Sequence, residues 1–263
     1  MKKMSLIIIF ALIFLLFIMV GCSDKIDDKA EKNDNTSYQQ EEVSEYSIME
    51  NSELSIGFNN VKIICHNKDR KDGEVCKEPE LLIDGKRYPL PTKYSEGVKL
   101  KVDDFTNDSN LDLFITNWYA TGTGTCITEG YLYAFINKNT PQEIFHNNHE
   151  NPIKYIKENT SINIDNNDGS YYIGIENEGK SIGEINIPQE YYGNEVVTKE
   201  DISYGSVLHY LVNENQPRVE ATVSMDMFVR RPVSVGALTL AYSYKDGKFV
   251  VAQVKLKNSG GAL

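Results

Sequence analysis

The sequence predicts a mainly β fold built from antiparallel meanders. Its 263 residues include many short runs rich in Val, Ile, Tyr and Phe, the residues that favour extended strands. Helical periodicity is weak, and only short stretches such as 152–157 and 198–202 could form a turn or two of helix. Several of the strand-like runs are separated by Asp-Gly, a dipeptide favoured in tight hairpins. These pairs are Asp84-Gly85, Asp168-Gly169 and Asp246-Gly247.

The spacing of the strand-like runs indicates how they connect. The clearest hairpin joins residues 237–244 to residues 248–256. Segments 111–145 and 206–256 share an order of strand, long loop, strand, turn and strand, which hints at an internal repeat. Such a repeat suits either a propeller-like stack of small sheets or a β-sandwich. The expected strands are 61–65, 80–83, 98–102, 111–117, 131–136, 161–164, 171–175, 206–212, 218–224, 237–244 and 249–256.

The N-terminus has three consecutive parts that are typical of an export signal. Lys2 and Lys3 supply positive charge before residues 6–20, which contain neither a charge nor a helix breaker. The run ends in the motif MVGC at 19–22. At about 1.5 Å per residue the apolar run makes roughly 22 Å of helix, short of the roughly 30 Å hydrocarbon core of a bilayer. The alternative of an uncleaved signal anchor therefore fits less well.

The MVGC motif resembles the lipobox of bacterial lipoproteins. In that family the cysteine is acylated with diacylglycerol and the peptide bond before it is cut. The resemblance therefore implies a signal peptide at 1–21 and a lipidated Cys22 as the mature N-terminus, although Met19 stands where an aliphatic residue is usual. Two acyl chains are enough for stable membrane attachment. We expect the protein on the outer, extracytoplasmic face of the cell membrane.

Composition divides the rest of the chain into a tether and a folded part. Residues 22–54 are dominated by acidic, amide and hydroxyl side chains and show no apolar periodicity. Such a segment cannot bury enough apolar surface to offset chain entropy, so we expect a flexible, disordered acidic tether. Residues 55–263 are enough for one large β domain or two small ones.

The net charge of −11 argues against one class of partner, nucleic acids. Nucleic-acid binding needs a basic face, which this composition does not favour. The same charge argues against wide contact with anionic lipid headgroups or polyanionic wall polymers, unless a cation bridges them. The remaining candidate partners are a protein, a peptide or a glycan.

Three cysteines follow Cys22 in the sequence. Cys65 and Cys76 flank the polar segment HNKDRKDGEV, which is typical of a hairpin loop. Antiparallel strands on either side could bring these two thiols together, and outside the cytoplasm such a pair can oxidise to a disulfide. The alternative is a set of reduced thiols. In either case Cys126 is left over.

One acidic loop has the pattern of a metal site. Residues 103–115 read DDFTNDSNLDLFI, with polar side chains at every second position. Calcium takes six to eight oxygen ligands, and alternating acidic and polar residues in a tight loop can provide them. The alternative is an aspartate-rich turn without a metal, since Asp and Asn favour turns by themselves. The candidate calcium ligands are Asp104, Thr106, Asp108, Asn110 and Asp112.

This loop resembles a single FG-GAP/VCBS-type repeat, whose pattern runs D-F-[ND]-G-D-G-x-x-D-[LI]. The resemblance implies calcium bound by the five residues named above. Thr106 replaces the usual Asn or Asp, and Ser109 replaces the turn glycine, where a positive φ costs a side chain about 1 kcal/mol. Both departures predict weak calcium binding. Over residues 98–256 the chain also resembles VCBS repeat-containing lipoproteins of low-GC Gram-positive bacteria, which implies no particular activity.

Other chemical motifs are sparse, so an enzyme is the less favoured class. His146 and His149 have a spacing that could hold zinc on a helix, but a polar loop is the better interpretation of FHNNHENP. Residues 165–169 fit a plain hairpin turn better than a second metal loop. No G-x-S-x-G, H-E-x-x-H or P-loop motif occurs. Cys126 and His209 could in principle form a thiol nucleophile and its base.

Two hypotheses from different classes follow. The first is a membrane-anchored β module that binds a protein, peptide or glycan, or acts as a scaffold. The second is an envelope hydrolase that acts on glycan or peptide through an unrecognised site. A shallow, tyrosine-rich exposed surface would favour the first. A deep pocket with converging acids, or a contact between Cys126 and His209, would favour the second.

Overall fold

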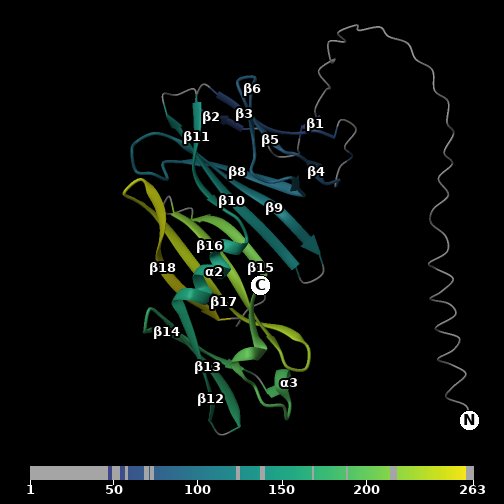
Figure 1. Cartoon of the computed structure of the whole chain (residues 1–263), viewed down its shortest axis with the longest axis vertical. Coiled ribbons are helices and arrows are strands. Elements are labelled where there is room, and N and C mark those ends of the chain that lie inside the picture. Colours follow the sequence, from purple (N-terminus) through teal and green to yellow (C-terminus); the bar gives the residue numbers. More distant parts are fainter. Residues whose placement is uncertain are drawn as a thin grey trace, which may run out of the picture. The chain divides into compact units, whose positions relative to one another are not determined.

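A computed structural model describes residues 47–48, 54–56, 59–67, 71, 74–122, 125–136, 140–167, 169–187, 189–213 and 218–258 (Figure 1). All of these residues belong to the unit formed by residues 44–263. The predicted signal peptide at 1–21, Cys22 and most of the predicted tether lie outside the described residues. Within the described part of the chain, no helix is long and apolar enough to cross a membrane.

The predicted mainly β class is confirmed, and the largest element is an eight-stranded sheet. Its order is β18-β17-β16-β15-β10-β9-β8, with β11 paired to β10 beside β15. Neighbouring strands are antiparallel except β10 and β15, which pair in parallel over two positions, Cys126 with Val207 and Ile127 with Leu208. The strands are β8 (Gly97–Asp103), β9 (Asp112–Gly122), β10 (Thr125–Ile136), β11 (Thr140–Asn147), β15 (Ile202–Asn213), β16 (Arg218–Phe228), β17 (Pro232–Lys245) and β18 (Lys248–Asn258).

Three smaller sheets accompany it. A five-stranded sheet contains β1 (Ser47–Ile48), β2 (Leu54–Ile56), β3 (Asn59–Cys65), β5 (Glu80–Ile83) and β6 (Lys86–Pro89). A two-stranded sheet pairs β4 (Cys76–Lys77) with β7 (Tyr94–Ser95). A three-stranded sheet contains β12 (Thr160–Asn167), β13 (Ser170–Asn177) and β14 (Lys180–Ile187).

Helices are short, as the weak helical periodicity predicts. Helix α2 (Glu150–Asn159) joins β11 to β12, and its buried residues are Pro152 and Ile156. The four-residue helix α3 (Gln189–Tyr192) and the 3-10 turn η1 (Lys199–Asp201) lie between β14 and β15. The predicted helical stretches at 152–157 and 198–202 therefore coincide with α2 and η1.

The pairing of β1 places the start of the fold before residue 55. Ser47 pairs with Cys65, and Ile48 pairs with Ile64. Ser47 also donates its hydroxyl hydrogen to the carbonyl oxygen of Asn67, at 3.0 Å. The end of the segment predicted as a tether at 22–54 thus contributes a short strand to the five-stranded sheet. Because this segment is polar, its composition did not predict that two of its residues pair with β3.

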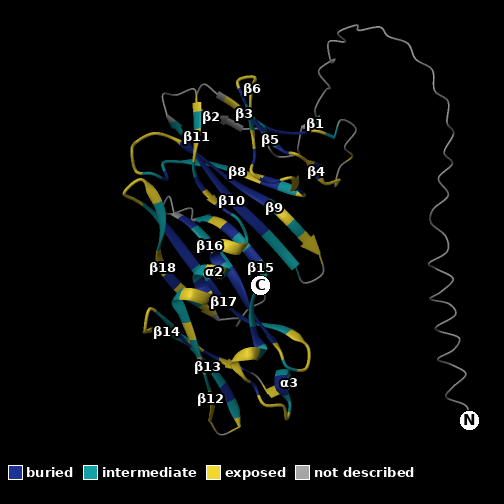
Figure 2. Cartoon of the chain, in the orientation of Figure 1, coloured by how far each residue is buried: buried dark blue, intermediate teal, exposed yellow. Residues whose placement is uncertain are grey.

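Two hydrophobic cores share the central strands β9 and β10, and Figure 2 shows the buried stretches that run along them. On one face, Leu113 and Ile115 of β9 pack with residues of the five-stranded sheet such as Ile63 and Leu81. On the other face, Phe114 packs in a core that includes residues of the three-stranded sheet, α2, and β15 to β18. Alternate side chains of one strand point to opposite faces, so the run Leu113-Phe114-Ile115 serves both cores.

The tight hairpin turns follow the Asp-Gly pairs. Asp84 and Gly85 have φ of 47° and 79°, and Asp246 and Gly247 have φ of 50° and 80°. Positive φ at both central residues is the mark of a type I′ turn, which matches the twist of the flanking strands. Gly169 also has a positive φ of 80°, whereas Asp168 lies outside the described residues.

Of the two predicted architectures, the packing favours a sandwich over a propeller. A propeller would place the two repeat-like segments in separate blades. Instead β9 to β11 and β15 to β18 belong to the same eight-stranded sheet, joined through β10 and β15. The smaller sheets cover opposite faces of parts of this sheet, as the two cores show.

Cys65 and Cys76 form a disulfide, the first of the two alternatives that the sequence left open. Their Cα atoms lie 5.3 Å apart, and both residues are fully buried. The bridge ties the end of β3 to the start of β4. Cys126 is a free thiol and is half-buried.

Candidate functional site

The acidic loop between β8 and β9 is organised around the carboxylate of Asp112. This side chain is fully buried at the first position of β9. Its Oδ2 accepts hydrogen bonds from the backbone N–H of Phe105 at 2.9 Å and of Thr106 at 3.0 Å, and from the Thr106 hydroxyl at 3.1 Å. The carboxylate therefore closes the loop onto its strand without any further group.

The other two acids of the loop also accept backbone hydrogen bonds. The Asp104 carboxylate accepts the N–H groups of Asp108 at 3.1 Å and Ser109 at 2.9 Å. Asp108 Oδ1 accepts the N–H of Asn110 at 2.8 Å. Ser109 has φ of 68°, in the left-handed region that favours glycine. Ser109, which stands at the turn-glycine position of the repeat pattern, thus has the backbone conformation that was expected to be strained for a residue with a side chain.

One atom of this loop fits a cation. Asp112 Oδ1 is buried and has no hydrogen-bond partner. Burial raises the pKa of Asp112, and the nearby Asp108 carboxylate adds to that rise. The hydrogen bonds from Asn110 instead lower the pKa of Asp108. A hard divalent cation would satisfy Asp112 Oδ1 and relieve the repulsion from Asp108.

The remaining predicted ligands fit such an ion less well. Both oxygens of Asp104 accept loop N–H groups, and the Thr106 hydroxyl donates to Asp112. Across the described residues, no group of three or more His, Cys, Asp or Glu side chains gathers in a metal-binding arrangement. The loop brings its five predicted residues into one turn but does not converge their oxygens on one point.

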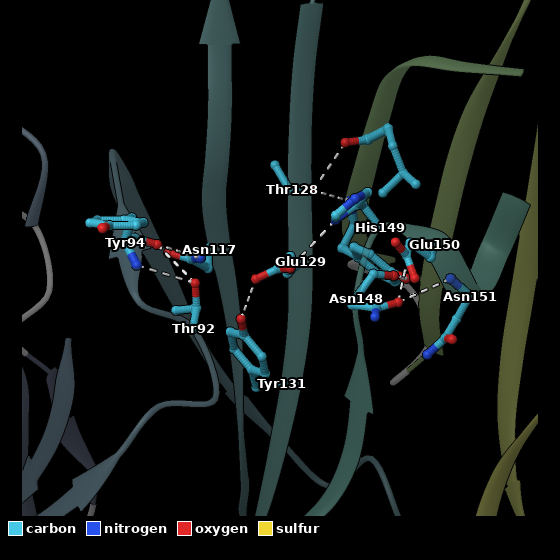
Figure 3. A network of polar contacts seen from close by, with 12 residues as sticks. Thr92, Tyr94, Asn117, Thr128, Glu129, Tyr131, Asn148, His149, Glu150 and Asn151 are labelled. Carbon is cyan, nitrogen blue, oxygen red and sulfur yellow. Dashed lines mark hydrogen bonds and ion pairs between the residues drawn. The ribbon is translucent and has the colours of Figure 1, made fainter. Parts of the chain in front are cut away.

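A second polar cluster, which the sequence did not single out, lies on β10 (Figure 3). Glu129 is only 6% exposed, yet it carries an ionisable group. Its Oε2 accepts a hydrogen bond from the Tyr131 hydroxyl at 2.5 Å. Its Oε1 lies 3.7 Å from Nδ1 of His149, close enough for an ion pair when His149 is protonated. A buried carboxylate needs such partners because its desolvation is costly.

This cluster lies where the partner strand of β10 changes from β15 to β11, a point that we call the fork. β10 pairs with β15 at Cys126 and Ile127, and with β11 only from Gly130 onward. At Thr128, between these two paired stretches, side-chain hydrogen bonds take the place of backbone ones. Its hydroxyl donates to the carbonyl oxygen of Leu208 at 3.2 Å and accepts the N–H of Tyr210 at 2.8 Å. Glu129 therefore sits where β15 and β11 diverge, beside the start of α2.

Packing at the fork is tight around Gly130. A Cβ on Gly130 would lie 3.0 Å from ring carbons of both Phe114 and Tyr210. On the neighbouring loop, Asn148 Oδ1 accepts the N–H groups of Glu150 and Asn151, each at 3.1 Å. This cap fixes the start of α2 and with it the position of His149.

Two exposed tyrosines adjoin the cluster. The register of β9 against β10 skips Tyr119, since Trp118 pairs with Thr128 and Ala120 with Ile127. Such a bulge re-aims a side chain, and the Tyr119 ring stacks on His149 with ring centroids 5.1 Å apart. Tyr119 is 40% exposed and Tyr94 is 51% exposed.

Tyr94 is linked to the cluster through Asn117. The Asn117 amide donates to the Tyr94 carbonyl oxygen at 3.5 Å, and the Thr92 hydroxyl donates to the same carbonyl at 2.9 Å. Asn117 is fully buried, pairs with Glu129 across the strands, and has an Oδ1 without a hydrogen-bond partner. We call Tyr94, Asn117, Tyr119, Glu129 and His149 the tyrosine face.

The thiol of Cys126 and the imidazole of His209, considered above as a nucleophile and its base, are in contact. Cys126 Sγ lies 3.8 Å from His209 Nδ1. Burial raises the pKa of the Cys126 thiol, with a further rise from the Glu96 carboxylate, and burial lowers the pKa of His209. Both shifts favour neutral side chains, whereas a cysteine nucleophile needs the thiolate. The contact is the one expected for a hydrolase, but neither pKa shift favours the ionised pair that a cysteine nucleophile requires.

The two histidines considered for zinc have separate partners. His146, in β11, lies against the Tyr131 ring, with ring centroids 5.1 Å apart, and its Nδ1 is 4.0 Å from Glu143 Oε1. His149 instead contacts Glu129 and Tyr119. The structure therefore supports neither a shared metal nor the polar loop expected for residue 146, because the strand β11 runs to Asn147.

No protein-family model matches the chain, and no curated protein is significantly similar to it. The fold and the two clusters together define a mainly β protein with a disulfide, a self-capped acidic loop and a buried carboxylate beneath exposed tyrosines.

Asp112 gives a test of how the loop is held without metal. In chelator, Asp112→Ala leaves two N–H groups and one hydroxyl without their acceptor, and we expect a loss of about 2–4 kcal/mol of unfolding free energy. Asp112→Asn keeps an acceptor oxygen and removes the charge, so we expect a change within about 1 kcal/mol. Urea unfolding at pH 7 measures both.

The pH dependence provides the control for this interpretation. A raised pKa means that the folded protein binds a proton at Asp112 more readily than the unfolded chain does. Stability from this group therefore falls as the pH rises above the ordinary aspartate value, and Asp112→Asn should not show that component. Equal losses in the Ala and Asn variants would contradict the hydrogen-bonding role.

Proposed function

We propose that the protein is a membrane-anchored extracytoplasmic binding module that recognises a glycan or peptide through the tyrosine face. The observation that carries this proposal is the pairing of exposed tyrosine rings with buried polar groups. Tyr94 and Tyr119 are both exposed residues, Asn117 donates to the backbone carbonyl of Tyr94, and the Tyr119 ring stacks on His149. Rigid aromatic rings beside fixed polar groups suit recognition of sugars and peptides at low entropic cost.

The disulfide supports the extracytoplasmic location. Cys65–Cys76 is buried within the fold, and disulfides persist mainly in oxidising compartments outside the cytoplasm. The lipobox-like motif ending in Cys22 supports attachment to the membrane by acyl chains. Together these features favour a surface role over a cytoplasmic one.

The hydrolase alternative has one observation in its favour, the contact between Cys126 and His209. Against it, the pKa of the thiol is raised and that of the imidazole lowered, so proton transfer to form a thiolate is unfavourable. The tyrosine face, by contrast, has the exposed aromatic rings that favour binding. We therefore prefer the binding module to the thiol hydrolase.

The acidic loop adds a second element to the proposal, a weak calcium site. Asp112 Oδ1 and the Asp108 carboxylate would hold the ion, and the unpartnered Oδ1 is the support for this. Asp104 would need to release loop N–H groups to join them, which limits affinity. Bound calcium would neutralise the carboxylates and stiffen the turn before β9. The likeness of this loop to FG-GAP/VCBS repeats remains part of the proposal.

Ligand recognition can be followed by the fluorescence of Trp118, the single tryptophan of the chain and the neighbour of Tyr119. We expect soluble glycan–peptide fragments of bacterial cell wall to change this fluorescence saturably in the detergent-solubilised protein. Tyr119→Ala should weaken binding about fivefold, since stacking of a ring contributes on the order of 1 kcal/mol.

The matched control is Phe228→Ala, which removes an aromatic ring that is 51% exposed but outside the tyrosine face. It should bind as the wild type does. Equal weakening in both variants, or no binding of the fragments to the wild type, would refute recognition of this ligand class by the tyrosine face.

The anchor is tested by labelling cells with a palmitate analogue. Cys22→Ala should abolish incorporation of the label and block cleavage before residue 22, because the acylated thiol is gone. Cys126→Ala, which removes another unpaired cysteine, should label like the wild type. Persistent labelling of Cys22→Ala would show that the lipid is attached elsewhere.

Calcium binding predicts a small, site-specific rise in melting temperature. At about 2 mM calcium and a dissociation constant near 0.2 mM, linkage adds roughly 1.4 kcal/mol, or a few degrees. Asp112→Asn should remove this response. The control Asp165→Asn, which makes the same charge change at an exposed position of β12, should retain it. A wild type that melts identically in calcium and in chelator would leave the loop as a turn without a metal.

A further inference from the structure

A hollow of about 390 Å³ lies where the end of α2, β12, η1 and the start of β15 meet. It is separate from the tyrosine face and from the acidic loop, because it shares none of their residues. Its size falls in the range of pockets that hold small molecules. The lining residues are Lys157, Thr160, Ile162, Lys199, Ile202, Ser203 and Tyr204.

The charged groups of this hollow are all cationic, in a chain whose net charge is −11. Lys157 comes from the last turn of α2, and Lys199 is the first residue of η1. Among the described residues, neither ammonium group has a carboxylate within ion-pair distance. These two lysines leave positive charge at the hollow available to a ligand.

The acids closest in sequence are engaged elsewhere. Asp201 accepts the N–H and the hydroxyl hydrogen of Thr198, each at 2.8 Å, and so caps η1. Glu158 lies 3.9 Å from Lys154 on the exposed side of α2. Glu200, the remaining acid of η1, does not line the hollow. The lysine charges therefore point to an external anion.

Lys157 is also not needed to cap its own helix. A basic residue in the last turn often compensates unpaired carbonyl groups. Here the Ile156 carbonyl oxygen accepts both the N–H and the hydroxyl hydrogen of Thr160, and Asn159 donates to the Tyr155 carbonyl. Because these carbonyl groups already accept hydrogen bonds, the Lys157 ammonium group can interact with a ligand in the hollow.

The uncharged part of the lining suits a small organic body. Ile162 and Ile202 form apolar wall, while Ser203 and Tyr204 add hydroxyl groups. Burial raises the pKa of Tyr204, so its phenol keeps its proton. Cations, hydroxyl donors and apolar wall together are the groups that bind a phosphate or sulfate ester.

We propose that the hollow between Lys157 and Lys199 binds a small tetrahedral oxyanion, a phosphate or sulfate group carried on a compact organic body. This site goes beyond the proposed recognition at the tyrosine face and does not depend on it. Lysine is a compact, strongly hydrated point charge, and two lysines suit a doubly charged group such as a phosphate monoester. The hydroxyls and isoleucines provide for the rest of the ligand.

Isothermal titration of the detergent-solubilised full chain tests the site with four probes at about 0.1 M salt. These probes are inorganic phosphate, inorganic sulfate, glycerol 3-phosphate and glycerol, and the salt suppresses unspecific attraction over distances beyond about 10 Å. We expect saturable binding of glycerol 3-phosphate and none of glycerol. The inorganic ions distinguish a site that binds the anion alone from one that also needs the organic body.

The variants are Lys157→Ala and Lys199→Ala, each of which should weaken binding roughly ten- to hundredfold. Lys154→Ala is the matched control, because it removes the same charge from the same helix outside the hollow. It should bind as the wild type does. A melting curve for each variant separates lost binding from lost folding.

Two results would overturn the proposal. The first is an absence of saturable binding of all three anions to the wild type at millimolar concentration. The second is an equal loss in Lys154→Ala and in the two hollow variants, which would show unspecific electrostatic attraction. Tyr119→Ala should leave the anion titration unchanged, so this experiment can succeed or fail separately from the test of the tyrosine face.

Discussion

The burial of β9 and β10 on both faces is the constraint on which the rest of the fold depends. A strand that is covered on both sides must be apolar at successive positions, as it is at Leu113, Phe114 and Ile115. The five-stranded sheet covers one face, and the three-stranded sheet with α2 belongs to the core on the other. The five-stranded sheet and the core on the other face thus both pack against this central pair of strands.

The polar groups of interest lie at the ends of that doubly buried region. Asp112 stands at the first position of β9, where the apolar run begins, and Asn117 and Glu129 stand where it gives way to the exposed half of the strands. Buried polar groups at these positions need hydrogen-bond or ion-pair partners. Those contacts in turn fix the neighbouring loops and rings. The acidic loop and the tyrosine face are therefore both consequences of how the central pair of strands ends.

Much of the fold could be predicted from the sequence, because strand-like runs and Asp-Gly turns are local signals. The terminal hairpin and the turns at Asp84-Gly85 and Asp246-Gly247 follow from them. The pairing of β10 with β15 and the cluster around Glu129 could not, because they join residues far apart in the chain. A single Glu in a strand carries no sign of its burial. The edge strand Ser47–Ile48 was missed because its composition is that of a linker.

The same long-range pairing has a consequence for how the chain folds. Thr128 and Leu208, which meet at the fork, are separated by 80 residues, whereas β9 to β11 and β15 to β18 consist mainly of sequence neighbours. Loop-closure entropy makes contacts between distant residues slow to form relative to hairpins. We therefore expect the two meanders to assemble first, each with an apolar edge exposed. Their late union would set the folding rate of the domain.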